Sequence, residues 1–200
     1  QIARYPALLD ELLDPRTYSD SVSKADIASD LKKRLDAIDS VDSEQQMYAI
    51  AQFQRATMFR IAVSDFNEKL PMMKVSDALT WLAELVLDEA LRVAWNDLSS
   101  KHGTPRYRTD GKNRAAGFGI IAYGKLGGLE LSYGSDLDIV FLHDSKGEEQ
   151  KTDGDKQLDN SLFFSRLVRR LVHFLTTQTG SGELYEIDTR LRPDGSSGLL

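Results

Sequence analysis

A glycine-rich segment followed by a short acidic strand most constrains how this chain can fold. Residues 124–128 read Gly-Lys-Leu-Gly-Gly, and residues 135–141 read Ser-Asp-Leu-Asp-Ile-Val-Phe. Successive side chains of a strand alternate between its faces, so Asp136 and Asp138 point the same way, about 6 to 7 Å apart. The apolar side chains between them face the opposite side. We therefore expect a strand with one acidic face and one buried face.

Two carboxylates on one strand face repel each other unless a cation lies between them. Mg²⁺ fits such a pair, because it is held by one or two carboxylates together with substrate phosphates. The preceding glycines let a backbone approach a phosphate with no Cβ in the way. An Asp-x-Asp pair is also common in solvated loops, but here it lies in an apolar strand, where an unpaired carboxylate is costly. Asp136 and Asp138 are therefore predicted metal ligands.

A third carboxylate follows later in the chain. Residues 183–193 read Glu-Leu-Tyr-Glu-Ile-Asp-Thr-Arg-Leu-Arg-Pro, in which every second residue from Leu184 to Arg190 shares one face of an expected strand. If this strand lies beside the first, Asp188 joins Asp136 and Asp138 around two cations about 3.5 to 4 Å apart. Arg190 and Arg192 then supply positive charge for phosphate oxygens.

Composition excludes several classes of protein. The chain has 25 Lys and Arg against 31 Asp and Glu, a net charge of −6, so we expect no nucleic-acid partner and favour a protein partner. The absence of cysteine excludes disulfides and thiolate metal sites and is compatible with the cytoplasm. We find no signal peptide and no apolar run near the roughly 18 residues of a membrane span, so we expect no membrane partner.

The apolar pattern divides the chain into a helical front and a mixed back. Helices are expected over residues 43–66, with Ser43 and Gln46 as a capping box, and over residues 76–101, where the apolar stripe comprises Val75, Leu79, Leu82, Val86, Ala90 and Val93. Trp81 and Trp95 are expected in the core. Residues 103–117 are interpreted as a linker, which gives a helical subdomain over 1–102 and a catalytic core over 118–200.

Within the catalytic core we expect buried strands over residues 118–123 and 136–143, a mobile charged loop over 144–157 and a helix over 159–177. One face of that helix is basic and carries Arg166, Arg169, Arg170 and His173. A solvated face is favoured over contact with a triphosphate or a partner. His143 and His173 have no companions at ligand spacing, so neither is predicted to bind metal.

Three strings resemble a known family. They are residues 123–131 (Tyr-Gly-Lys-Leu-Gly-Gly-Leu-Glu-Leu), residues 135–138 (Ser-Asp-Leu-Asp) and residues 185–195 (Tyr-Glu-Ile-Asp-Thr-Arg-Leu-Arg-Pro-Asp-Gly). The spacing is similar to the DNA polymerase beta-like nucleotidyltransferase superfamily, in which serine usually stands where this chain has Lys125. The full strings resemble glutamine synthetase adenylyltransferase, in which that lysine is normal. Residues 3–15 and 70–84 resemble its helical lead-in.

The resemblance implies an α+β fold, with a helical N-terminal part followed by a mixed sheet with packed helices. It also implies transfer of AMP from ATP to a tyrosine hydroxyl of glutamine synthetase, which regulates nitrogen assimilation, with a PII signalling protein and glutamine as regulators. Two Mg²⁺ ions would be held by Asp136, Asp138 and Asp188, with Asp188 also accepting the proton. Gly124, Lys125 and Ser135 would hold the β- and γ-phosphates.

This family carries two catalytic halves, one adding and one removing the adenylyl group. Residues 185–188 and 142–144 resemble the C-terminal, adenylylating half more closely. Gln1 in place of an initiator Met, and the end at Leu200, lead us to expect a piece truncated on its C-terminal side. The removing half and a non-catalytic nucleotide-sensing module remain alternatives. A P-loop kinase is disfavoured, because Gly-x-x-x-x-Gly-Lys-Ser/Thr is absent.

Overall fold

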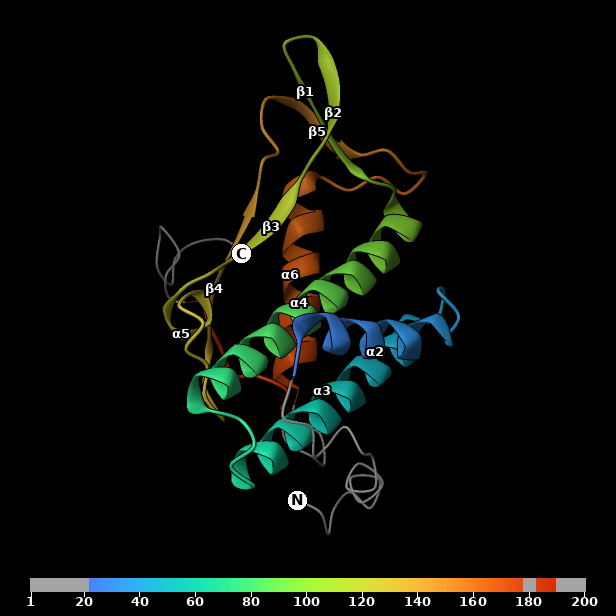
Figure 1. The fold of residues 1–200 in the computed structure, drawn as a ribbon. Helices are drawn as coiled ribbons and strands as arrows, with labels where there is room; N and C mark the ends of the chain where they lie inside the picture. Colours follow the sequence, from blue (N-terminus) through green and yellow to red (C-terminus); the bar gives the residue numbers. More distant parts are fainter. Residues whose placement is uncertain (1–21, 178–182, 190–200) are drawn as a thin grey trace.

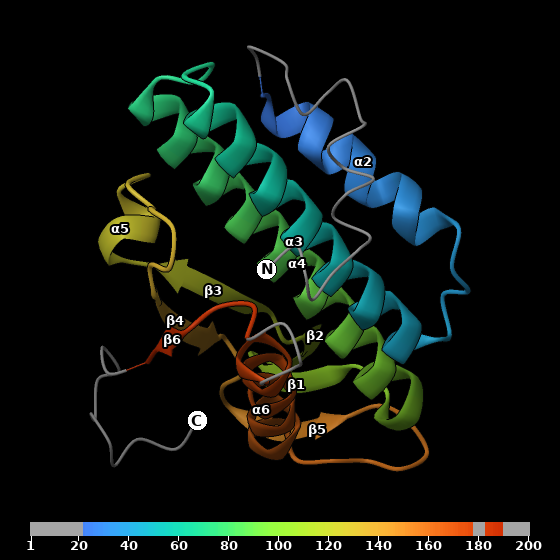
Figure 2. The same cartoon turned by 90° about the horizontal axis from the view of Figure 1, so that it is seen from below.

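The computed structural model describes residues 22–177 and 183–189. Three helices form the front of this part of the chain, α2 (Lys24–Asp36), α3 (Ser43–Phe66) and α4 (Met72–His102), and they run side by side (Figures 1 and 2). The bounds of α3 agree with those expected from the sequence. Helix α4 begins four residues earlier than expected, because Pro71 stands in extended conformation just ahead of it and its carbonyl accepts from Lys74.

The cap of α3 differs from the expected capping box. Asp42, not Ser43, is the N-cap residue, and its side chain accepts a hydrogen bond from the backbone N–H of Gln45 at 2.9 Å. The Gln46 side chain instead donates to the carbonyl of Asp39. An aspartate at the N-cap satisfies one open N–H and complements the helix dipole.

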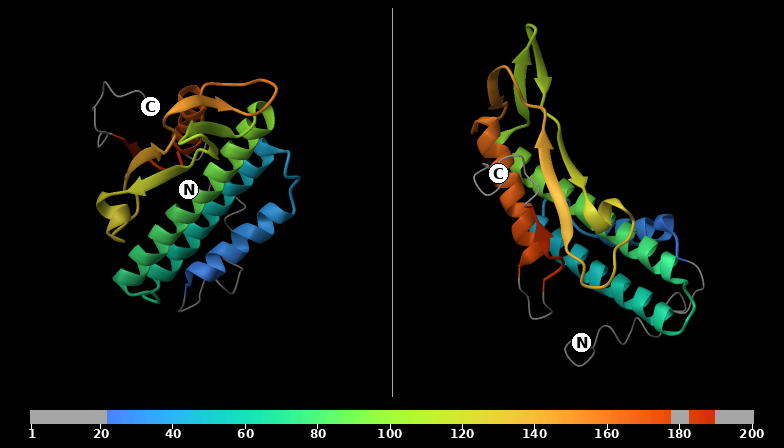
Figure 3. Two further views of the ribbon diagram at one scale, coloured as in Figure 1. Left: turned by 90° about the horizontal axis from the view of Figure 1, so that it is seen from above. Right: turned by 90° about the vertical axis from the view of Figure 1, so that its left-hand side faces the viewer.

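A small antiparallel sheet replaces two segments that were expected to be irregular. Strands β1 (Pro105–Thr109) and β2 (Lys112–Ala115) form a hairpin within the predicted linker, and β5 (Glu148–Thr152) pairs with β1 within the predicted mobile loop. Asp110 and Gly111 both have positive φ, which suits a two-residue hairpin turn. The hairpin projects from the body of the protein (Figures 1 and 3). The side chains of β2 are solvated on both faces, and those of β5 are solvated except for Thr152, so neither β2 nor β5 shows an apolar alternation. In β1, Pro105 and Tyr107 are buried on one face.

The second sheet carries the candidate site. Strand β3 (Phe118–Ala122) pairs antiparallel with β4 (Leu137–His143), and β4 pairs parallel with β6 (Ile187–Asp188). The short helix α5 (Gly124–Gly127) follows β3, and α6 (Asn160–Thr176) lies between β5 and β6 in the chain. The expected strands at β3 and β4 are confirmed, although β3 is half-buried to exposed rather than buried.

The alternation expected before Asp188 is wrong. Leu184 and Tyr185 are consecutive, and both are buried at 7% exposure. Both backbone N–H groups donate to the carbonyl of Leu175 at the end of α6. This contact turns both side chains into the core and confines the described strand to two residues.

One hydrophobic core joins the helices to the sheet. All six residues of the expected α4 stripe are buried, and Trp81 and Trp95 pack against the core as expected. Trp95 meets Phe163 of α6 edge-to-face, with ring centroids 5.4 Å apart, which ties α4 to α6. On β4, Leu137 and Ile139 are fully buried, so the opposite face of the strand is left for Asp138.

The sequence favoured a solvated basic face on α6, but the structure shows that this face is solvated only in part. Arg166 and Arg169 are exposed. Arg170 is half-buried, forms an ion pair with Asp97 of α4 and donates to the Ser43 hydroxyl at 3.2 Å. Arg170 therefore joins three helices. Within residues 22–177 and 183–189, the structure has no helix long and apolar enough to cross a membrane.

Candidate metal-nucleotide site

Three carboxylates meet where β4 and β6 lie side by side. Carboxylate oxygens of Asp136, Asp138 and Asp188 all lie within 4.8 Å of one another, and all three residues are half-buried. The parallel register places Asp138 opposite Asp188, and the N–H of Leu137 donates to the carbonyl of Glu186 at 2.8 Å. The predicted convergence of the three aspartates is confirmed. Oxygen ligands at this spacing fit a hard divalent cation.

Gly124 lies directly against the Asp138 carboxylate of this cluster. It has φ of +52°, and a Cβ at this position would overlap the Asp138 carboxylate. The N–H of Tyr123 donates to the carbonyl of Asp138 at 2.9 Å, which holds the two segments together. The positive φ favours glycine at this position, and a Cβ would force the Asp138 carboxylate to move. The lack of a side chain on Gly124 thus leaves the space that the proposed metal ligand Asp138 occupies.

The turn before Asp136 is closed by its own serines. The N–H of Ser135 donates to the carbonyl of Ser132 at 3.1 Å, and Gly134 has the positive φ that a type II turn needs. The Ser135 hydroxyl accepts from the N–H of Ser132 at 3.1 Å and lies 2.9 Å from the Ser132 hydroxyl. Ser135, predicted to contact phosphate, therefore caps the turn in this structure.

Tyr133 links this turn to helix α3, a contact that the sequence analysis did not find. Its hydroxyl donates to the Asp65 carboxylate at 3.1 Å, across 68 positions of the chain. Partial burial and the bond to Asp65 both raise the pKa of Tyr133, so the hydroxyl keeps the proton that it donates. The sequence carries no pattern that could pair these two residues.

A cavity of about 410 Å³ lies between α3 and this turn. Its walls come from α3, from residues 131–135 and from residues 183–186, so it adjoins the residues preceding both acidic strands. Tyr185 also lines it, and its hydroxyl is buried. Burial raises the pKa of Tyr185, so this hydroxyl is neutral at physiological pH.

The remaining predicted residues are placed as follows. Lys125 is exposed on α5, next to Gly124, and is open to a ligand. Arg190 and Arg192 lie outside the described residues. His143 stacks on Phe164, with ring centroids 4.5 Å apart. Neither His143 nor His173 belongs to a cluster of three possible metal ligands within the described part of the chain.

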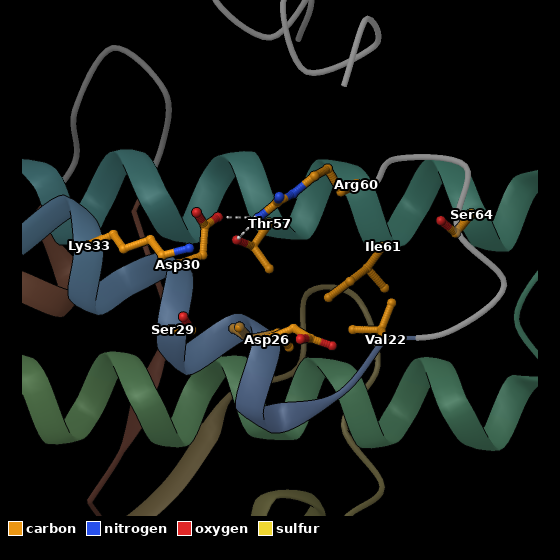
Figure 4. Close-up of a pocket in the computed structure, with 10 residues that line it drawn as sticks. Val22, Asp26, Ser29, Asp30, Lys33, Thr57, Arg60, Ile61 and Ser64 are labelled. Atoms are coloured by element: carbon orange, nitrogen blue, oxygen red, sulfur yellow. Dashed lines mark hydrogen bonds and ion pairs between the residues drawn. The ribbon is translucent and has the colours of Figure 1, made fainter. Parts of the chain in front are cut away.

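A separate pocket of about 370 Å³ lies between α2 and α3 (Figure 4). Arg60 on one wall bonds to Asp30 at 3.1 Å and to Thr57 at 3.0 Å, as the dashed lines show. No residue of the acidic cluster lines it. The cluster on β4 and β6 is therefore the stronger candidate for chemistry.

A mixed sheet with packed helices, and three carboxylates that converge on two of its strands or just before them, define a protein of the nucleotidyltransferase type. Comparison with known proteins narrows this class. The family described as glutamate-ammonia ligase adenylyltransferase matches residues 1–200. The chain belongs to this family.

Curated relatives agree with that assignment. The chain is 54% identical over 199 residues to the bifunctional glutamine synthetase adenylyltransferase/adenylyl-removing enzyme of Thioalkalivibrio sulfidiphilus. It is 52% identical to the enzyme of that name from Pseudomonas putida and 50% identical to the one from Nitrosococcus oceani, each over 200 residues. All of this chain is covered in each case, but only 20%, 20% and 21% of the relatives. The chain thus spans about a fifth of their length.

Proposed function

We propose that this chain carries an adenylyl-transfer site, which moves AMP from ATP to a tyrosine hydroxyl of glutamine synthetase. The observation that carries the proposal is the convergence of the carboxylates of Asp136, Asp138 and Asp188. They lie next to Gly124, where a side chain would overlap the Asp138 carboxylate. The names of the relatives, which include both an adenylyltransferase and an adenylyl-removing activity, support the substrate.

The three carboxylates fit a divalent cation by their chemistry and spacing. Asp136, Asp138 and Asp188 would hold Mg²⁺, with two ions in the full site. When bound, Mg²⁺ neutralises phosphate charge and lowers the pKa of a coordinated hydroxyl.

Other residues of the chain would bind the phosphates, and Asp188 would accept the proton. Lys125 would neutralise charge on the triphosphate, because its side chain is exposed on α5 next to Gly124. Arg190 and Arg192 are proposed to contact phosphate oxygens as well. Asp188 accepts the proton of the attacking tyrosine hydroxyl. The new bond joins that oxygen to the α-phosphorus, the bond to the β-phosphate oxygen breaks, and pyrophosphate leaves.

The test is incubation of the chain with unmodified glutamine synthetase, Mg²⁺ and ATP labelled in its α-phosphate. We expect label on a tyrosine of glutamine synthetase and none with an Asp138→Asn chain. Label on neither protein, with ATP still bound, would favour a nucleotide-sensing module instead. In full-length relatives, the same assay with a PII protein and glutamine added would measure regulation.

The adenylyl-removing activity is the second candidate, because the relatives' names join both activities. The two reactions use the same displacement at phosphorus, so the carboxylates do not distinguish them. Adenylylated glutamine synthetase, Mg²⁺ and phosphate should therefore be supplied as a second mixture. ADP release there, without transfer in the forward assay, would assign this chain to the removing half.

A further inference from the structure

The segment between Leu131 and Leu137, which carries Asp136, makes few contacts that fix its position. Leu131 and Leu137 are buried at 3% and 0% exposure and anchor its two ends in the core. Between them, Ser132, Tyr133 and Gly134 are exposed. The bonds between Ser132 and Ser135 close the turn upon itself, but they do not fix its position relative to the rest of the protein.

Packing against α3 does not fix the turn either, because the cavity of about 410 Å³ lies between them. Tyr133 lines this cavity, and its hydroxyl donates to the carboxylate of Asp65, which lies in the last turn of α3. Asp65 is half-buried in a helix whose buried face belongs to the core. Its position is thus set by the helical part of the protein, independently of the sheet.

We propose that Tyr133 is a positioning residue for the candidate metal site, which holds the turn before Asp136 in place through its hydrogen bond to Asp65. This inference rests on the proposed function, because it assumes that Asp136 binds a cation. Tyr133 touches neither metal nor nucleotide in this role. Its hydroxyl reduces the freedom of the turn, so Asp136 does not have to be ordered when the cation binds.

The proposal also gives the helical front a role in the site. Helix α5 and the end of the α3–α4 hairpin lie on the same side of the protein (Figures 1 and 3). The bond between Tyr133 and Asp65 joins the two parts there. A displacement of α3 would therefore move the turn and, with it, one of the three carboxylates.

Direct titration of the purified chain with Mn²⁺, followed by electron paramagnetic resonance, tests the proposal without any turnover. Tyr133→Phe keeps the ring and removes only the hydroxyl. We expect it to weaken Mn²⁺ binding by about three- to tenfold, which corresponds to one hydrogen bond. Tyr48→Phe is the matched control, because Tyr48 is 65% exposed on α3, and it should bind Mn²⁺ as the wild type does.

Variants of Asp65 separate positioning from a general loss of structure. Asp65→Asn keeps an acceptor oxygen and should bind Mn²⁺ nearly as the wild type does, whereas Asp65→Leu should match Tyr133→Phe. The double variant Tyr133→Phe/Asp65→Leu should lose no more than either single variant, since both remove the same bond. A merely structural bond would lower the melting temperature and leave the Mn²⁺ affinity of the folded chain unchanged.

Two results would overturn the inference in distinguishable ways. Unchanged Mn²⁺ affinity in Tyr133→Phe, with a clear loss in Asp138→Asn, would reject the positioning role and keep the metal site. Equal Mn²⁺ affinity in the wild type and in Asp138→Asn would reject the metal site itself, and the positioning role with it.

Discussion

The carboxylate of Asp138 occupies the space that a side chain on Gly124 would fill. Gly124 also has φ of +52°, a conformation that costs other residues about 1 to 2 kcal/mol. Two separate requirements for glycine therefore meet at one residue of the site. The overlap displaces a proposed metal ligand, whereas the backbone cost only lowers stability.

Gly124→Ala is expected to abolish Mn²⁺ binding and adenylyl transfer while the chain stays folded. Gly111→Ala is the matched control, since Gly111 has φ of +71° with nothing within 4 Å of its missing Cβ. Both variants should lose similar stability, and only Gly124→Ala should lose metal affinity. Thermal unfolding and Mn²⁺ titration measure the two effects. Equal metal affinity in both variants would mean that the contact with Asp138 has no functional consequence.

Asp138→Asn should abolish adenylyl transfer without lowering stability in the absence of metal. Removing one of three clustered carboxylates relieves repulsion, so the melting temperature in a chelating buffer should hold or rise slightly. Added Mg²⁺ should raise the melting temperature of the wild type but not of the variant. Asp155→Asn, at an exposed site outside the cluster, is the control. Transfer at the wild-type rate by Asp138→Asn would contradict the metal assignment.

The long helices could be predicted because their burial follows a helical period. The stripe from Val75 to Val93 is buried at every expected position, and the bounds of α3 agree with those observed. Strand β4 could be predicted equally well, since the buried Leu137 and Ile139 alternate with Asp138. In each case one element has one buried face, so local sequence and burial carry the same information.

The hairpin and β5 could not be predicted from local pattern. The side chains of β2 and β5 are almost all solvated, so no periodicity marks these two strands, and β1 buries only Pro105 and Tyr107. The pairing of β1 with β5 joins residues far apart, such as Arg106 and Lys151. At the site, the spacing of the motif predicted the convergence of three aspartates, but their role as metal ligands stays a prediction. The bond between Tyr133 and Asp65 depends on how α3 packs, which no single segment encodes. The division into subdomains at residues 103–117 stays a prediction as well.

Lys125→Met tests the glycine-rich segment. If the ammonium group of Lys125 neutralises the triphosphate, its loss removes one charge-assisted contact of about 1.5 to 3 kcal/mol. The dissociation constant of Mg·ATP should then rise roughly ten- to a hundredfold, as measured by calorimetry. Lys112→Met removes an exposed lysine of the hairpin instead and should leave ATP binding unchanged. An unchanged constant in Lys125→Met would make Lys125 a solvated lysine with no part in binding.

Arg170→Gln is expected to destabilise the protein without changing nucleotide binding. Arg170 joins α6 to Asp97 of α4 and to Ser43 of α3, and its partner Asp97 has a side chain only 14% exposed. The loss of a half-buried ion pair with an added hydrogen bond should lower the free energy of unfolding by about 1 to 2 kcal/mol. Arg169→Gln is the matched control, because Arg169 is exposed on the same helix and should cost no more than about 0.5 kcal/mol. Urea denaturation of both variants measures the difference, while Mg·ATP titration should show neither affected. If Arg170→Gln weakened ATP binding at unchanged stability, the basic face of α6 would belong to the nucleotide site after all.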